Sequence, residues 1–273
     1  MDKKHNVNKD MKKKNKSVFQ LKITLDDSAP RVWRRILISK DASFFELHVA
    51  IQDAMGWGDG HLHSFSLAQK ETAVPICIEF PDPERDELYG SDDKRDERVE
   101  KIADYFGVSI KQCQYTYDFG DNWTHEVLLE KEVPAIAGTR YPQCTTGKNA
   151  CPSEDCGGVW GYQDMLKIIQ DKKHSEHKDI MDWLGIDDVS EYDPTAFVVG
   201  DVEFRDAKKE LRVYEKGFGD DTNDSAEIAE MVAFLKQSRL PQVGTWEVAQ
   251  RVDPVMAKTT GKKNEFLVTV VVD

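Results

Sequence analysis

The clearest chemical potential in this sequence lies in three histidines and two aspartates that occur in two separate stretches. Residues 61–67 alternate as a predicted strand, and residues 113–131 predict a hairpin around Gly120-Asp121-Asn122. Successive side chains of a strand point to opposite faces, so residues two apart share a face. If the two stretches are neighbours in the sheet, we expect one pocket lined by His61, His63, Asp118, Asp121, Trp123 and His125.

Three kinds of chemistry suit this set of residues. Neutral imidazoles and carboxylates are typical ligands of zinc, iron or manganese. The same groups can supply a general base for catalysis. The third interpretation is structural, with each histidine half-buried and hydrogen-bonded to an aspartate that stabilises the hairpin. The sequence leaves all three interpretations open.

Three of the five cysteines form a second candidate site within an irregular stretch, residues 134–158. Cys144, Cys151 and Cys156 are separated by six and four residues. Thiolates at such spacings can close a loop around zinc, which makes zinc the candidate cofactor, with a fourth ligand from elsewhere in the chain. The alternative is that these cysteines are small apolar residues in a tightly turned loop.

Charge limits the partners that we expect. The 273 residues include 37 Lys and Arg against 50 Asp and Glu, a net charge of −13. An acidic body of this kind repels phosphate backbones, so nucleic acid is not an expected partner of the body. Residues 1–17 hold seven lysines and two aspartates, which predicts a disordered basic arm. The alternative is that this arm contacts nucleic acid.

The compartment follows from two further features. No run of about 18 apolar residues occurs, so we expect no membrane span, and the first residues lack the apolar segment of a secretory signal. Five cysteines in such a chain predict a reducing compartment, the cytoplasm.

The apolar pattern predicts an α+β fold with a mixed β-sheet. An initial strand-strand-helix-strand unit comes first, and Ser43 with Glu46 forms a capping box at the start of its helix. The hairpin and a C-terminal group of helices follow. Residues 79–100 are predicted to form a long exposed loop, because they carry ten acidic residues against four basic ones. The predicted elements cover residues 18–25, 32–39, 43–55, 61–67, 113–131, 162–169, 175–184 and 202–213.

The domain organisation has three predicted parts. The basic arm covers residues 1–17, and the α+β domain covers residues 18–213. Residues 217–224 are rich in Gly and Asp, as linkers are. Residues 214–273 therefore predict a linker and a small helix-strand-strand segment.

Several of these motifs together resemble the plasmid pRiA4b ORF-3-like family, also called transposon-passenger TnpR-like proteins. The resemblance covers about residues 17–213. It implies an α+β domain with a mixed sheet and an association with mobile elements, and it implies no particular activity. The motifs are Val32-Trp33-Arg34-Arg35-Ile36, Met55-Gly56-Trp57 with His61-Leu62-His63-Ser64-Phe65, Tyr117-Asp118-Phe119-Gly120-Asp121-Asn122-Trp123-Thr124-His125, Tyr141-Pro142, Cys151-Pro152-Ser153-Glu154-Asp155-Cys156-Gly157-Gly158, Gly161-Tyr162 and Tyr192-Asp193-Pro194.

From these observations we expect a non-catalytic cytoplasmic binding or interaction domain with a His/Asp-lined pocket, whose partner is a ligand or another protein. The first alternative is a metal-dependent, hydrolase-like enzyme that uses the His/Asp cluster. The second is a nucleic-acid accessory protein that acts through the Lys-rich arm.

Overall fold

The computed structural model describes residues 17–69, 74–82, 94–107 and 110–217. The chain divides into two units, Met1–Tyr214 and Glu215–Asp273, and nearly all described residues belong to the first unit. The predicted basic arm and the predicted C-terminal linker and segment lie almost entirely outside the described residues.

The first two strands form because apolar side chains alternate along them. β1 (Ser17–Leu25) pairs antiparallel with β2 (Trp33–Ser39). Every second side chain of each strand is buried on the face that becomes the core. These buried apolar side chains are Phe19, Leu21, Ile23, Leu25, Ile36 and Ile38.

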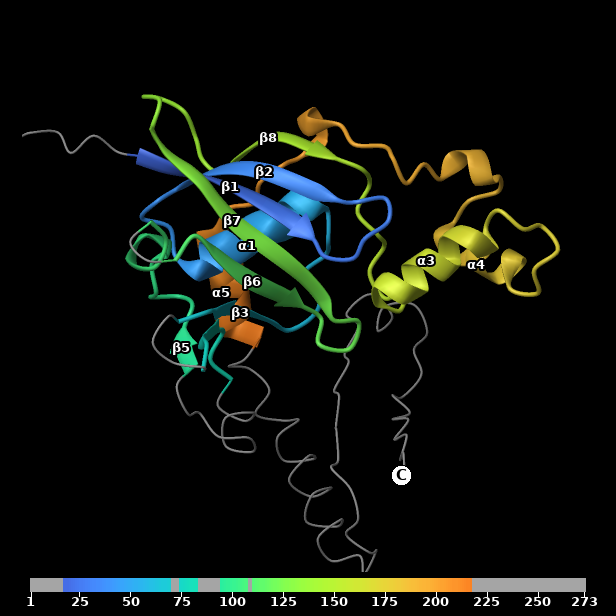
Figure 1. Cartoon of the computed structure of the whole chain (residues 1–273), viewed down its shortest axis with the longest axis horizontal. Coiled ribbons are helices and arrows are strands. Elements are labelled where there is room, and N and C mark those ends of the chain that lie inside the picture. The colour runs from blue at the N-terminus through green and yellow to red at the C-terminus, as the bar shows by residue number, and fades with distance from the viewer. Residues whose placement is uncertain (1–16, 70–73, 83–93, 108–109, 218–273) are drawn as a thin grey trace, which may run out of the picture. The chain divides into compact units, whose positions relative to one another are not determined.

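The helix α1 (Phe44–Met55) follows and covers one face of the sheet (Figure 1). Its predicted capping box is confirmed, because the Ser43 side chain accepts a hydrogen bond from the Glu46 amide and the Glu46 side chain accepts one from the Ser43 amide. Gly56 ends the helix in a left-handed conformation. With β3 (His63–Leu67) next in the chain, the predicted strand-strand-helix-strand unit is confirmed.

The strands form one eight-stranded mixed sheet in the order β5-β4-β3-β6-β7-β1-β2-β8. All neighbours are antiparallel except β4 and β5, which are parallel. The predicted hairpin is the antiparallel pair β6–β7, and it places His63 of β3 beside Tyr117 of β6. The remaining strands are β4 (Ile76–Glu79), β5 (Lys94–Asp96), β6 (Gln112–Tyr117), β7 (Trp123–Pro134) and β8 (Gln143–Lys148).

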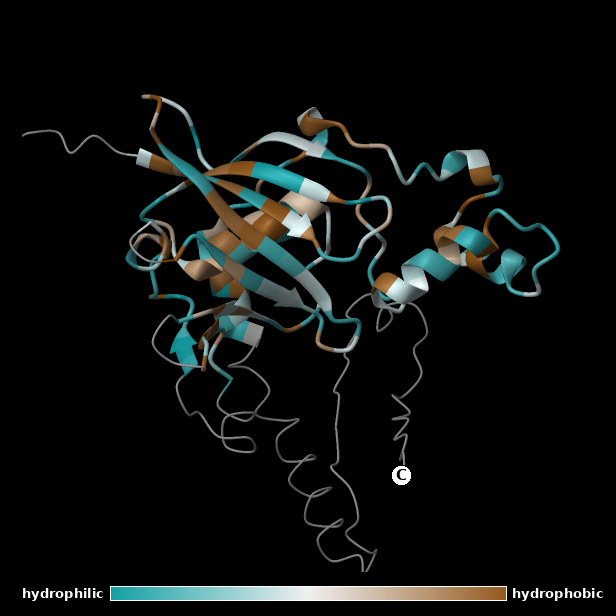
Figure 2. Cartoon of the chain, viewed as in Figure 1, coloured by the Kyte–Doolittle hydropathy of each residue, from teal (hydrophilic) through white to brown (hydrophobic). Residues whose placement is uncertain are grey.

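The core lies between α1 and the sheet. Figure 2 shows apolar residues concentrated on α1 and on the strands that it covers. Burial of these side chains is the main stabilising contribution to the fold. A smaller cluster of Phe45, Val49 and Phe80 packs against residues of the last described helix.

The C-terminal group of helices is also confirmed, and with it the α+β class. Three helices, α3 (Gly158–Ile168), α4 (His177–Leu184) and α5 (Ala207–Gly217), follow the sheet. The last begins five residues later than predicted, where the Asp206 side chain caps it by accepting a hydrogen bond from the Lys208 amide at 3.1 Å. Val199–Asp201 forms a separate 3-10 turn, η3. Two other 3-10 turns are η1 (Ile102–Asp104) and η2 (Val189–Glu191). Within the described ranges, no helix combines the length and the apolar character needed to cross a membrane.

Two stretches differ from the prediction. Residues 79–100 are not simply an exposed loop, since Lys94–Asp96 forms β5 and Glu97 is completely buried. Gln143–Lys148 forms a strand where an irregular stretch was expected, because the outer edge of β2 offers it backbone partners. Charge content and turn residues describe a stretch on average, whereas strand pairing is decided by distant neighbours.

Candidate functional site

Three loops meet beside the end of β6. The Trp57 indole donates to the Pro152 carbonyl at 2.9 Å, and the Gly58 amide donates to Glu154 Oε2 at 2.7 Å. The Tyr117 hydroxyl donates to the other Glu154 oxygen at 2.5 Å. These bonds hold the segment that follows β8 against the loop after α1, and so they determine where the next residue, Asp155, lies.

A close backbone approach attaches the same segment to the hairpin turn. The Gly157 amide donates to Asp121 Oδ2 at 3.1 Å. Gly158 has a φ of +66°, and a Cβ at this position would lie 2.3 Å from the Asp121 carbonyl oxygen. Only glycine fits such a contact without moving the backbone. The start of α3 therefore packs directly against the turn between β6 and β7. Asp121 makes this contact with both its carboxylate and its backbone carbonyl.

His61, Asp118 and Asp155, which we call the triad, come together where these loops meet. His61 Nε2 lies 3.1 Å from Asp155 Oδ1 and 3.6 Å from Asp118 Oδ2. One ligand atom from each residue lies within 4.8 Å of the other two. The side chains of the three residues are 21%, 12% and 44% exposed respectively, so a small ligand can reach them from solvent.

The local backbone orients the Asp118 carboxylate of the triad. Asp118 Oδ1 accepts hydrogen bonds from the amides of Gly120 at 2.9 Å and Asp121 at 3.3 Å, so Oδ2 is the oxygen directed to His61. Asp118 and Asp155 have φ values of +55° and +60°, a region that costs free energy for residues other than glycine. The surrounding contacts maintain this strain at two of the three triad residues.

The triad has the composition of an open metal site. One imidazole and two carboxylates form a three-ligand set for a divalent transition metal, with further coordination positions left for water or a ligand. In the part of the chain that the structure describes, the triad is the one place where three such side chains converge in this way.

His63 does not join the triad, which corrects the prediction of one shared pocket. Its ring is buried, and Nε2 lies 2.8 Å from Glu97 Oε2. It stacks on the ring of His48, with 3.4 Å between ring centroids and 2° between ring planes. Alternation along β3 points His63 into the core, whereas His61 precedes the strand and lies at the rim.

The buried partner ring, His48, belongs to a hydrogen-bonded network. Burial lowers the pKa of His48, and the neighbouring His63 lowers it further, so the ring is neutral. A neutral ring satisfies both contacts if Nε2 donates to Asp59 Oδ1 at 2.8 Å and Nδ1 accepts from the Tyr115 hydroxyl at 2.8 Å. The Tyr214 hydroxyl also donates to Asp59, at 2.6 Å.

The network explains the ionised state of Asp59. Burial alone would raise the pKa of this carboxyl, but the hydrogen bonds that the His48 ring and the Tyr214 hydroxyl donate to it hold the pKa below its usual value. Arg205 Nη2, 3.6 Å from Asp59 Oδ2, supplies the nearby positive charge. This network is a buried structural unit distinct from the triad, and within the described residues Asp59 Oδ2 has the Arg205 charge beside it but no hydrogen-bond partner.

His125 and Trp123 lie deeper still. Both side chains are fully buried, and the Trp57 ring packs on each of them, at centroid distances of 5.3 and 5.7 Å. Trp57 in turn stacks on Tyr117, which contacts His61. Aromatic rings therefore separate these two residues from the triad, and the structure does not bring them into the predicted pocket.

Burial of His125 predicts a pH effect on stability. Burial is the main cause that lowers the pKa of His125 to about 4, against about 6.5 in the unfolded chain. Between these two pKa values His125 is protonated in the unfolded chain but not in the folded chain. Proton binding therefore favours the unfolded chain, and the contribution of His125 to stability falls as the pH drops from 6.5 to 4. The loss reaches about 3 kcal/mol.

The test is the free energy of unfolding of His125→Phe, measured by urea denaturation between pH 7 and pH 4.5. Phenylalanine keeps a ring against Trp57 but removes the titration. The variant is expected to lose less stability on acidification than the parent protein. Equal losses in the two proteins would contradict the assignment of this pH effect to His125.

The three cysteines do not form the predicted zinc site within the described ranges. All are free thiols, and they do not bring three ligand atoms together. The Cys144 thiol faces the Thr146 carbonyl, and the Cys156 thiol faces the Gly158 carbonyl. Burial raises the pKa of all three thiols, that of Cys156 to about 12, so they stay protonated. They act as small, mostly apolar residues of the turned segment.

Residue patterns alone missed several groups that the structure makes important. Asp155 is not among the residues predicted to line the pocket, and its pairing with His61 joins segments nearly a hundred residues apart. His48 had a signal that could have revealed it, since its neighbours Leu47, Val49, Ala50 and Ile51 are all apolar residues of a helix in which nearly every residue is buried. Glu97 was hidden by the acidic composition around it.

Comparison with known proteins places the chain among relatives. The model of a family described as "Plasmid pRiA4b ORF-3-like protein" matches residues 17–201. An uncharacterized protein of Sinorhizobium fredii, y4hQ, is 34% identical over 180 residues, which are 66% of this chain and 86% of that protein. The crystal structure of MM3350 from Methanosarcina mazei Go1, a protein of unknown function, is similar with a TM-score of 0.61 and 40% identity, over 69% of this chain and 99% of that one.

Proposed function

Because this chain belongs to the plasmid pRiA4b ORF-3-like protein family, whose relatives above carry no stated activity, we propose its function from the geometry of the triad. The protein is a binding domain that holds a divalent metal ion between His61, Asp118 and Asp155. The main support for this proposal is that one ring nitrogen of His61 and one carboxylate oxygen of each aspartate all lie within 4.8 Å of one another. All five cysteines lie in the part of the chain that the structure describes, and all are free thiols. This supports a reducing compartment such as the cytoplasm.

The surroundings of the triad favour binding over catalysis. In a hydrolase, a base beside the ion assists catalysis by accepting the proton of the attacking water. Glu154 is the carboxylate next to the triad in sequence, but its two oxygens accept hydrogen bonds from the Gly58 amide and the Tyr117 hydroxyl. It therefore positions the loop. The hydrolase alternative uses the same ion, with a water molecule at one of its free coordination positions as the nucleophile.

The test is calorimetric titration of the chelator-treated full chain with Zn²⁺ and with Mn²⁺. We expect one equivalent to bind, and Asp118→Asn and His61→Ala each to weaken binding at least tenfold, because each removes one of three ligands. Glu132→Gln is the matched control, since Glu132 is an exposed acid that pairs with Lys40 and belongs neither to the triad nor to its surroundings.

Two results would contradict the proposal. The first is that neither Zn²⁺ nor Mn²⁺ binds in a stoichiometric amount. The second is binding that survives both triad substitutions but disappears in Cys144→Ser, Cys151→Ser or Cys156→Ser, which would assign the ion to thiols. Far-ultraviolet circular dichroism of each variant separates loss of ligand from loss of fold.

A further inference from the structure

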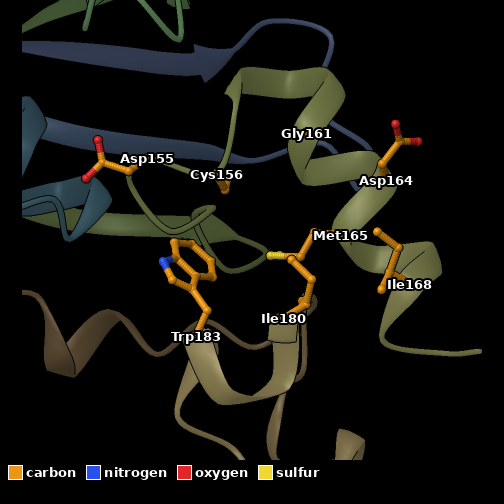
Figure 3. Close-up of a pocket in the computed structure, with 8 residues that line it drawn as sticks. All are labelled: Asp155, Cys156, Gly161, Asp164, Met165, Ile168, Ile180 and Trp183. Carbon is orange, nitrogen blue, oxygen red and sulfur yellow. The ribbon is translucent and has the colours of Figure 1, made fainter. Parts of the chain in front are cut away.

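A partly apolar pocket lies next to the triad, between α3 and α4. Its volume is about 350 Å³, at the lower end of the range for small-molecule sites. Figure 3 shows Asp155 at one end of the pocket and Ile168 at the other, with the Trp183 indole between Asp155 and the side chains of Met165 and Ile180. The Trp183 side chain is about half exposed, which leaves an apolar ring face open to a ligand.

Asp155 connects this pocket to the triad. The residue lines the pocket, and its Oδ1 lies 3.1 Å from His61 Nε2. A molecule that fills the pocket therefore ends beside any ion that the triad holds. This inference rests on the proposed metal site.

Charge indicates which end group such a molecule carries. The residues that line the pocket include two carboxylates, Asp155 and Asp164, and no basic residue. The pocket by itself repels an anion, whereas an ion on the triad has coordination positions free for an oxygen donor. Met165, Ile168, Ile180 and Trp183 offer an apolar wall to the remainder of the molecule.

We propose that the pocket between α3 and α4 and the triad together bind a small amphipathic carboxylate, whose carboxyl group coordinates the ion and whose apolar chain lies against Trp183. Two physical consequences follow. Binding requires the ion, and affinity rises with chain length. Each methylene that leaves water for an apolar wall contributes about a fourfold gain in affinity, until the pocket is full.

The experiment measures zinc uptake first and then titrates the zinc-loaded full chain with acetate, butanoate, hexanoate and octanoate. We expect affinity to rise along this series, and hexanoate binding to fall at least tenfold when zinc is removed by chelation. Trp183→Ala should weaken hexanoate binding at least fivefold and leave zinc affinity unchanged. Trp160→Ala is the matched control, because Trp160 is a more exposed tryptophan of α3 that does not line the pocket.

The outcomes separate this inference from the proposed function. If the chain takes up no zinc, both fall. If zinc binds but affinity does not change with chain length, or if Trp183→Ala has no effect, only the amphipathic ligand is overturned. If the zinc-free chain binds hexylamine in preference to hexanoate, the pocket carboxylates act directly on a cation, and the proposed ligand class is wrong.

Discussion

Replacing His63 with phenylalanine is expected to lower the free energy of unfolding by about 3–5 kcal/mol. The variant keeps an aromatic ring to stack on His48 but removes the partner of Glu97 Oε2. Glu97 is fully buried, and among the residues that the structure describes its other oxygen, Oε1, has no hydrogen-bond partner. The substitution thus leaves a carboxylate inside the core without compensation, and breaking a buried pair in this way has a large cost.

A second substitution tests the cause of this loss. Glu97→Gln removes the charge, so the double variant should recover at least about 1 kcal/mol relative to His63→Phe, which is a non-additive effect of two groups in contact. His61→Phe is the control at the partly exposed triad, and it should cost less than about 1 kcal/mol. Urea unfolding followed by circular dichroism gives all four values. If the double variant is less stable than His63→Phe, the buried charge is not the cause.

Gly158→Ala is expected to destabilise the chain by about 2–5 kcal/mol, through backbone strain and a steric clash together. The added Cβ would lie 2.3 Å from the Asp121 carbonyl oxygen, and backbone atoms cannot move away as a flexible side chain can. Because this contact presses the start of α3 against the hairpin turn, the substitution should also displace Asp155 from His61. Zinc affinity is therefore expected to fall although no triad residue has changed.

Gly185→Ala provides a closely matched comparison. Its φ of +68° is almost that of Gly158, at +66°, but a Cβ at Gly185 would meet no atom within 4 Å. It should cost about 1 kcal/mol, the strain of the left-handed backbone without a clash, and leave zinc affinity intact. Thermal or urea unfolding compares the two variants. If both variants lose the same free energy of unfolding, the close contact between Gly158 and Asp121 does not contribute to the loss.

Short-range patterns were sufficient for the elements that carry the site. The alternation of Phe19, Leu21 and Ile23 predicted β1, and the Ser43–Glu46 capping box predicted the start of α1 to the residue. The turn between β6 and β7 was equally clear from Gly120-Asp121-Asn122. Such signals are contained within a few neighbouring residues, because strand alternation, helix capping and turn geometry are local properties of the chain.

The partners of the ionisable side chains needed the tertiary structure. His61 and Asp118 were assigned to one pocket from the sequence, and they lie 3.6 Å apart, but Asp155 reaches them only because Glu154, Gly157 and Gly158 hold its loop against the hairpin. His63 faces Glu97 rather than an aspartate of the hairpin, although both candidates are acidic. The sequence determines which residues can ionise, stack or coordinate. Which of them meet depends on contacts between distant segments, and only folding brings those segments together.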